Sequence, residues 1–406
     1  MVHTRIRKGN TKSGILLPAV DYCSSQAVIA DDQIFLLGQT GLTLDGETFV
    51  GKGNPAEQAE NAMSNVKILL EESGSSINDI CKIVVYTTDI SYRNQVYPVI
   101  AKYLKDVNPV STGIVVKSLA KPYIDFEIDV WAVIPKNKDI GHLRLMSCNS
   151  KNGYLMPNLD FGNSRVIKAN ENIFLQGQTG LTLDGKNFIG KGDLEKQTDQ
   201  AMKNIQELLC KIGSNLEDIC KMTVYIKDLK YRQTVYRVIS EYLKNIHPVS
   251  TGVVIKGLAS DELDVEIDIF AHSQKVKNRY FQSKPNYLSD IDFPLSKIVK
   301  SGKSIFLQGQ TGLSLKNNKL IGQNNPELQA ETAMNNVKVL LESIGASLGD
   351  ICKIITYVAD IKTRDLVYPV IAKYIKDVYP TSTGLVVESL SDSELEFEID
   401  VFAVLK

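Results

Sequence analysis

The chain has 406 residues, of which 43% are hydrophobic and 23% charged, so it has enough apolar material for two or three globular domains. Its formal net charge of −1 excludes the cationic excess that drives sequence-independent binding to nucleic acid or anionic lipid. No stretch approaches the ~18 apolar residues of a membrane span, and we expect a cytoplasmic protein. The six cysteines form no CxxC pair and the four histidines are scattered, so neither disulfides nor a metal site is expected.

One sequence unit occurs three times. "IFLLGQTGLTLDG" (34–46) returns as "IFLQGQTGLTLDG" (173–185) and "IFLQGQTGLSLKN" (305–317), and "PVSTG" (109–113) returns at 248–252 and as "PTSTG" at 380–384. A period of this length suits whole domains rather than a solenoid. We therefore predict domains at 1–138, 139–273 and 274–406. The polar segments that open the second and third copies are interpreted as linkers.

The first copy opens with two elements of clear pattern. Residues 24–39 predict a β-hairpin with its turn at Asp31 and Asp32. Residues 54–74 predict a helix of about five turns. Asn54 is its expected N-cap, Pro55 its first residue and Gly74 the residue after its end. The apolar stripe expected to face the core comprises Ala59, Ala62, Met63, Val66, Leu69 and Leu70.

The rest of the copy alternates strands with one more helix. Residues 81–89 predict a strand, and a second helix over about 92–105 must end before Pro109. Two further strands, at 111–119 and 124–133, close the unit. The order ββαβαββ, with helices on one face of a largely antiparallel sheet, predicts an α+β domain that is built three times.

The closing strand raises the question of what covers the second face of the sheet. Alternation places Phe126, Ile128 and Val130 on one face and Glu127, Asp129 and Trp131 on the other. Packing the helices on the apolar face leaves the carboxylates either in solvent or turned inward. A solvated face is the default interpretation, because charged residues are rarely fully buried without partners. Three equivalent domains weaken it, because head-to-tail contacts can close into a ring with the sheets inside.

These motifs resemble the RidA/YjgF family, also labelled L-PSP endoribonuclease. The resemblance covers nearly all of each copy: the "IFLxGQTG" strand and turn, the helix with "AMxNVKxLLE", the "DICKIxxY" strand, the "PVSTG" strand and the closing "EID" strand. It implies a chorismate-mutase-like fold in which three chains form a trimer, with a small-molecule site at each subunit interface. The present chain would then be a monomeric pseudo-trimer.

The resemblance also implies a chemistry and a set of site residues. Active family members hydrolyse enamines and imines of 2-keto acids to the keto acid and ammonia without metal or cofactor. Their acidic catalytic residue matches Glu127, Glu266 and Glu398. Their serine on the first strand matches Ser25, Ser164 and Ser296, and an asparagine of the second helix is replaced by Tyr97, Tyr236 and Tyr368.

The "PVSTG" turn departs from the family pattern. Where the family has an arginine that holds the substrate carboxylate, this chain has Ser111, Ser250 and Ser382. A neutral hydroxyl holds a carboxylate at least tenfold more weakly than a guanidinium. The hydroxyls of these serines and of the following threonines can still orient a polar ligand. The threonines are Thr112, Thr251 and Thr383.

Other recurring residues have an ordinary interpretation beside the functional one. Cys81, Cys220 and Cys352 are expected to be buried thiols rather than nucleophiles, because no histidine recurs beside them. The GQTG glycines are expected to form a turn rather than a phosphate loop. Three arginines recur at the start of the second helix, as members of ion pairs or as replacement anchors for an anionic ligand. These are Arg93, Arg232 and Arg364.

The sequence leaves three functions open. The first is a protein that binds small imine, enamine or carbonyl metabolites in interdomain clefts and hydrolyses them. The second is a non-catalytic metabolite-binding or regulatory protein. The third is the ribonuclease of the older family label, which the net charge and the lack of a recurring aromatic stacking platform disfavour. The sequence does not name the substrate.

Overall fold

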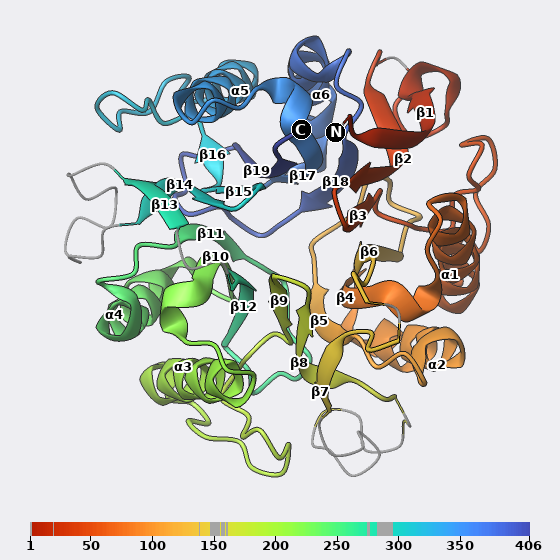
Figure 1. The fold of residues 1–406 in the computed structure, drawn as a ribbon. Coiled ribbons are helices and arrows are strands. Elements are labelled where there is room, and N and C mark those ends of the chain that lie inside the picture. Colours follow the sequence, from red (N-terminus) through yellow and green to blue (C-terminus); the bar gives the residue numbers. More distant parts are fainter. Residues whose placement is uncertain are drawn as a thin grey trace.

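The computed structural model describes residues 2–18, 20–137, 139–146, 155, 159, 161–273, 277–281 and 295–406. The three copies are arranged around a common centre, with their sheets inside and their helices on the outer rim (Figure 1). The two chain ends lie close together on this ring. The expected α+β fold and the pseudo-trimer are confirmed. The domain boundaries predicted after residues 138 and 273 adjoin positions outside the described residues.

Each copy contains two long helices packed on one face of a mixed sheet. The first copy contains β1 (Thr4–Asn10), β2 (Cys23–Ala30), β3 (Gln33–Leu36), α1 (Pro55–Glu72), β4 (Ile80–Thr87), α2 (Arg93–Leu104), β5 (Val110–Val115) and β6 (Phe126–Val133). The second contains β7 (Leu143–Met146), β8 (Ser164–Ala169), β9 (Asn172–Leu175), α3 (Leu194–Lys211), β10 (Ile219–Ile226), α4 (Arg232–Leu243), β11 (Val249–Val254) and β12 (Val265–His272). The third contains β13 (Lys277–Phe281), β14 (Ser296–Ser301), β15 (Ser304–Leu307), β16 (Gln310–Thr311), α5 (Pro326–Ser343), β17 (Ile351–Val358), α6 (Ile361–Ile375), β18 (Thr381–Val386) and β19 (Phe397–Val404).

Each sheet has an edge strand that the sequence did not predict, and the third sheet also contains the short β16, which pairs with β19. The strand order in the first copy is β1-β2-β3-β6-β4-β5, antiparallel except for the parallel pair β4 and β5. The additional edge strands are β1, β7 and β13. Interpreting the segments that open copies two and three wholly as linkers was therefore wrong. Their described parts pair with β8 and β14, because even a polar edge strand satisfies its backbone hydrogen bonds in a ladder.

The first helix follows its sequence signals closely. Asn54 caps α1 by accepting a hydrogen bond from the backbone of Glu57, Pro55 is its first residue, and Gly74 has a φ of +72° just beyond its end. The predicted apolar stripe is fully buried against the sheet. None of the helices in the described ranges combines the length and the apolar character that crossing a bilayer requires.

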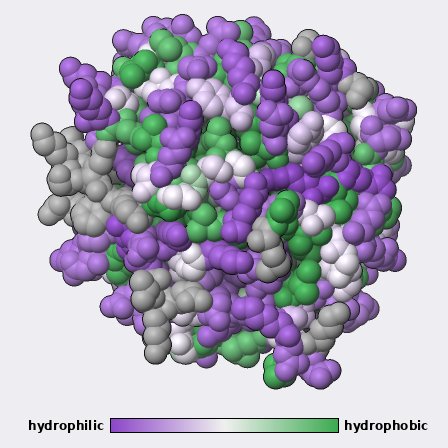
Figure 2. Space-filling view, turned by 45° about the horizontal axis from the view of Figure 1, so that its top comes forward, coloured by the Kyte–Doolittle hydropathy of each residue, from purple (hydrophilic) through white to green (hydrophobic). Residues whose placement is uncertain are grey.

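The second face of each sheet is turned inward. Glu127 and Asp129 are 5% and 0% exposed, so a solvated carboxylate face is excluded. Trp131 meets its counterparts Phe270 and Phe402 at ring-centroid distances of 6.0 Å or less, and the three share one apolar cluster with residues of all three copies. The inward faces of the three sheets therefore form one shared apolar interior. Hydrophilic side chains cover much of the outer surface (Figure 2).

Buried ion pairs join each copy to the next. Lys353 of the third copy lies 2.9 Å from Asp129 of the first, and both side chains are fully buried. Its ammonium also donates to the backbone oxygen of Leu36 and to the hydroxyl of Thr383. The same arrangement recurs between copies one and two and between copies two and three. These pairs are Lys82 with Asp268 at 2.5 Å and Lys221 with Asp400 at 2.9 Å.

A second repeated contact fastens the outer part of each interface. Arg5 on β1 donates 2.8 Å to the backbone oxygen of Tyr379, and the hydroxyl of Ser25 donates to the same oxygen at 2.8 Å. Tyr379 precedes a proline and has a φ of +55°, which orients its carbonyl towards the neighbouring copy. The equivalent donors are Arg144 and Ser164 on Asn108, and Arg279 and Ser296 on His247.

We predict that a Lys353→Met substitution destabilises the whole chain by about 3 to 5 kcal/mol, because it leaves Asp129 buried without its cation. The double variant Lys353→Met, Asp129→Leu should recover most of that loss, since an apolar pair replaces the ionic one. Chemical denaturation with the wild type beside both variants measures this. A single variant as stable as the wild type would show that the ion pair does not hold the interface.

Candidate functional site

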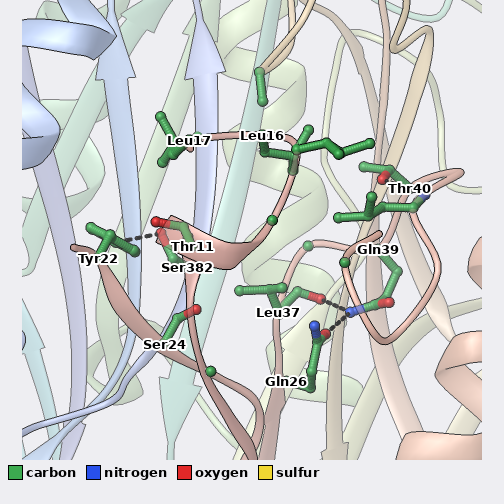
Figure 3. Close-up of a pocket in the computed structure, with 18 of the residues that line it drawn as sticks. Thr11, Leu16, Leu17, Tyr22, Ser24, Gln26, Leu37, Gln39, Thr40 and Ser382 are labelled. Carbon is green, nitrogen blue, oxygen red and sulfur yellow. Dashed lines mark hydrogen bonds between the residues drawn. The ribbon is translucent and has the colours of Figure 1, made fainter. Parts of the chain in front are cut away.

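A cleft opens where the first copy meets the third. Its volume is about 310 Å³. The first copy contributes the β2 and β3 region, the GQTG turn and Glu127, while the third contributes Arg364, Tyr368, Ser382 and Gly384. The segment after β1 borders the same cavity through Leu16 and Leu17 (Figure 3). The GQTG turn and Glu127 of the first copy therefore meet the "PTSTG" strand of the third copy here.

Glycine in the GQTG turn makes room for the carboxylate. The φ angle of Gly38 is not in the left-handed region, so the turn itself does not demand glycine. A methyl group at Gly38 would overlap the carboxylate of Glu127, and methyl groups at Gly177 and Gly309 would overlap those of Glu266 and Glu398. The close approach of the acid therefore explains why glycine is required at this position of the turn.

Burial makes these carboxylates weak acids. Burial, followed by the charge of Asp129, raises the pKa of Glu127 to about 8, against the opposing influence of Arg364 and Lys353. The pKa values of Glu266 and Glu398 are raised to about 8 by the same causes in their own clefts. At neutral pH each is mainly protonated, so it can donate a proton and, once ionised, accept one.

The arginine of the second helix faces the carboxylate from the neighbouring copy. Arg364 is 5% exposed, stacks on the ring of Tyr368 at 4.5 Å, and its Nη1 is buried without a hydrogen-bond partner. Gly384 allows this pair to approach, because a methyl group there would overlap both side chains. Arg93 and Arg232 stack on Tyr97 and Tyr236 in the same way. None of the three arginines forms an ion pair within the described chain, so the ion-pair interpretation is wrong.

The serine of "PTSTG" is already hydrogen-bonded in the first cleft. The hydroxyl of Tyr22 donates to Ser382 Oγ at 2.8 Å (Figure 3). The Tyr22 ring lies 5.1 Å from that of Tyr368. Tyr22 is a lining residue that sequence reasoning missed, because it lies just before the predicted hairpin, in a stretch without a recognisable motif.

The other two interfaces repeat this arrangement of residues with differences. In the second cleft Arg93, Tyr97 and Ser111 of copy one face Glu266 of copy two around a smaller cavity of about 50 Å³. Phe161 replaces Tyr22 there and packs edge-on against Tyr97. At the third interface Arg232 lies close enough to Glu398 to oppose its pKa shift, and Tyr236 and Ser250 share a hydrogen bond of 2.8 Å.

Several residues predicted for the site lie elsewhere. The hydroxyls of Ser25, Ser164 and Ser296 donate to backbone oxygens of the neighbouring copy and fasten the interface. The threonines belong to the buried ion-pair network instead, as their contacts with aspartate show. These contacts are Thr112 with Asp268, Thr251 with Asp400 and Thr383 with Asp129. The repeated cysteines are fully buried, and burial raises the pKa of each thiol to about 12, as expected for core residues.

Sequence reasoning also missed the interface lysines. Lys82 sits in the middle of the buried strand β4, where a charged residue is out of place unless it has a partner. Its recurrence at Lys221 and Lys353, together with the recurring aspartate of "EID", was a signal that could have predicted an ion pair between copies. No cluster of three or more metal-ligating side chains occurs in the described ranges.

Comparison with known proteins defines the class. The family model described as Endoribonuclease L-PSP matches residues 16–134, 161–273 and 290–405. The chain belongs to this family and contains three copies of its domain.

Relatives and a solved structure agree with this assignment. A RutC family protein of Pyrococcus horikoshii is 35% identical over 112 residues, which are 27% of this chain and 86% of that protein. Reactive Intermediate Deaminase A, chloroplastic, of Arabidopsis thaliana is 30% identical over 106 residues, which are 26% of this chain and 54% of that protein. A chorismatase crystal structure superposes with a TM-score of 0.51 at 12% identity, covering 80% of this chain and 93% of its own. The chorismatase likeness concerns the fold alone.

We predict that the triple variant Glu127→Gln, Glu266→Gln, Glu398→Gln gains stability relative to the wild type as the pH rises from about 5 to 8. A raised folded-state pKa contributes stability that is complete below the unfolded pKa and is lost as the pH rises through the folded pKa. Glutamine does not titrate, so the difference grows with pH, by at most about 1.4 kcal/mol per pH unit and site.

Denaturant unfolding at several pH values measures that difference. The exposed Glu47→Gln substitution is the matched control and should show no such trend. A difference between the triple variant and the wild type that stays constant from pH 5 to 9 would contradict the raised pKa values.

Proposed function

We propose that the chain binds small imine, enamine or carbonyl metabolites in its three interdomain clefts and hydrolyses imines to the carbonyl compound and ammonia. The observation that carries this proposal is the pairing in each cleft of a buried carboxyl group with a pKa near 8 and a guanidinium from the next copy. The name of the Arabidopsis relative, Reactive Intermediate Deaminase A, supports the same chemistry.

The residues suggest a division of roles. The protonated Glu127 donates its proton to the imine nitrogen, and the resulting carboxylate takes a proton from the water that adds to the imine carbon. Collapse of the carbinolamine then forms the carbonyl group and releases ammonia, so that one water is consumed for each imine. A group with a pKa close to the working pH suits both transfers.

Arg364 is the proposed anchor for the acidic or polar end of the ligand. Its unpartnered Nη1 lies in a cleft whose "PTSTG" serine is occupied by Tyr22. A charge-assisted hydrogen bond from this guanidinium compensates for the arginine that the turn lacks. The ligand is therefore held by the second helix of one copy and acted on by the closing strand of the next.

We predict that the wild-type chain accelerates ammonia release from 2-imino acids generated in situ by an amino-acid oxidase. The triple Glu→Gln variant should lose this turnover by about 100-fold or more, because it lacks the group that transfers the proton. Keto-acid and ammonia release are measured together, with Glu47→Gln as the control variant.

Other outcomes assign the chain differently. Full turnover in the triple variant would remove these carboxylates from the mechanism. Ligand binding without turnover by the wild type would identify a non-catalytic metabolite-binding protein. Cleavage of RNA that depends on the three glutamates would identify a nuclease instead.

A further inference from the structure

The first two clefts share their framework residues but differ greatly in volume. The cleft between copies one and three measures about 310 Å³, and the cleft between copies one and two about 50 Å³. Small-molecule sites in proteins span roughly 300 to 1,000 Å³. The first cleft therefore has room for a ligand with several carbon atoms, whereas the second has room only for waters or a very small solute.

The apolar walls of the two clefts do not account for this difference, because they are built from equivalent positions. The equivalent pairs are Leu16 and Leu155, Leu42 and Leu181, Ala120 and Ala259, and Ile124 and Leu263. The aromatic residues at the next pair of positions, Tyr22 and Phe161, differ only by a hydroxyl group. The cause of the different volumes must lie at other positions.

Three positions on neighbouring strands do differ between the clefts. In the first cleft they are Ser24 and Gln26 on β2 and Leu37 just after β3, and in the second they are Asn163 just before β8, Arg165 on β8 and Gln176 just after β9. The backbone N–H of Leu37 donates to the carbonyl of Gln26 at 2.9 Å, and that of Gln176 donates to Arg165 at 3.0 Å. The strand position and the position after the next strand are therefore adjacent in both copies.

Two long polar side chains meet at the second cleft but not at the first. Arg165 donates 2.7 Å to Gln176 Oε1, and both residues line the small cavity. Leu37 can form no such bond, and Gln26 Oε1 instead accepts 3.2 Å from Gln39 (Figure 3). The space that the arginine and glutamine occupy in the second cleft is thus left open beside Leu37 in the first.

The open space of the first cleft combines an apolar wall with a cation. Leu16, Leu37 and Leu42 line this cleft and are only partly buried, so a ligand can cover more of their surface. Each methylene that a ligand buries strengthens binding about fourfold. The same cleft contains Arg364, whose Nη1 is buried and without a hydrogen-bond partner. These features match an acid with an apolar body.

We propose that the first cleft selects small carboxylic acids with a branched apolar side chain, that Leu37 determines this specificity, and that the second cleft excludes such acids. The carboxylate binds Arg364, and the apolar side chain packs against Leu16, Leu37 and Leu42. The inference rests on the proposed function only in taking Arg364 as the anchor of the acidic end. It makes two clefts of one chain unequal in the size of ligand that they accept.

Calorimetric titration of the full chain with α-ketoisocaproate and pyruvate tests this inference. Both acids carry the same keto acid end, and they differ only in the branched apolar side chain of the first. The ratio of their affinities therefore reports on the apolar wall and not on the anchor. We expect a site that binds α-ketoisocaproate at least about tenfold more tightly than pyruvate.

Variants of Leu37 assign this site. Leu37→Gln introduces the residue that copies two and three carry, and it should weaken α-ketoisocaproate by about tenfold or more while changing pyruvate by less than about twofold. Leu37→Met keeps an apolar side chain of similar volume and should retain the preference, even if Leu37→Gln fails to fold. Leu328→Gln, at a side chain that is 43% exposed on α5, is the matched control and should bind both acids as the wild type does.

The reciprocal change tests the second cleft. The triple variant Asn163→Ser, Arg165→Gln, Gln176→Leu gives it the three residues of the first cleft, and we expect one additional tight site for α-ketoisocaproate. No additional site in a folded triple variant would contradict the assignment of size selection to these positions.

The remaining outcomes have distinct meanings. Equal affinities for the two acids, or an unchanged preference in Leu37→Gln, would overturn the proposal. Because binding is measured without turnover, a chain that hydrolyses no imine can still confirm it. Conversely, a chain that hydrolyses imines but binds both acids equally contradicts this inference alone.

Discussion

The structure depends on a lysine that crosses from one copy into the next. Lys353, Lys82 and Lys221 each lie in the middle of a buried strand and meet an aspartate of the neighbouring copy. Isolated ions of this kind are too costly to bury, so each sheet is stable only when its neighbour supplies the opposite charge. Three such contacts, each between unlike surfaces, close a ring and leave no fourth interface. The inner sheet faces, the clefts and the acid groups all follow from that closure.

The same ion pairs explain why the pKa of Glu127 is raised. Glu127 and Asp129 share one face of β6, and only the aspartate receives a lysine. With the cation committed there, Glu127 is buried beside a negative charge, and its pKa rises to about 8. Glycine at position 38 allows the backbone of the neighbouring turn to pack closely against this carboxyl group. The lysine–aspartate pair thus stabilises the interface and also raises the pKa of the neighbouring Glu127 towards neutrality.

Because the three domains are joined in one chain, equivalent positions at their interfaces can carry different residues, which is impossible in a trimer of identical chains. In a symmetric trimer every site has the same residues, whereas here Tyr22 is matched by Phe161, and Gln26 by Arg165 and Lys297. The framework residues, by contrast, are the same in all three copies: the lysine and aspartate of the ion pair, the glutamate, the arginine and the two close-packed glycines. Variation thus occurs in the strand and loop that border the first two clefts, while the residues that hold the ring together stay the same.

The sequence by itself determined the threefold repeat, the helices and most strands, and which face of β6 is apolar. These follow from local patterns, such as the cap at Asn54 and the alternation from Phe126 to Trp131. It also placed Glu127 and the "PVSTG" turn in one candidate site through the family resemblance. The edge strands β1, β7 and β13 escaped prediction, because β1 and β13 are mostly polar, β7 has only four residues, and the pairing of all three depends on the neighbouring strand.

Only the tertiary structure decided which copies share a cleft. It joined Glu127 to Arg364 and Ser382, more than 230 residues away along the chain, and it assigned Ser25 to the interface and Tyr22 to the cavity. It also showed that Arg364 stacks on Tyr368 instead of forming an ion pair. Those outcomes depend on burial and on contacts between distant segments, and neither is encoded in the local pattern of residues.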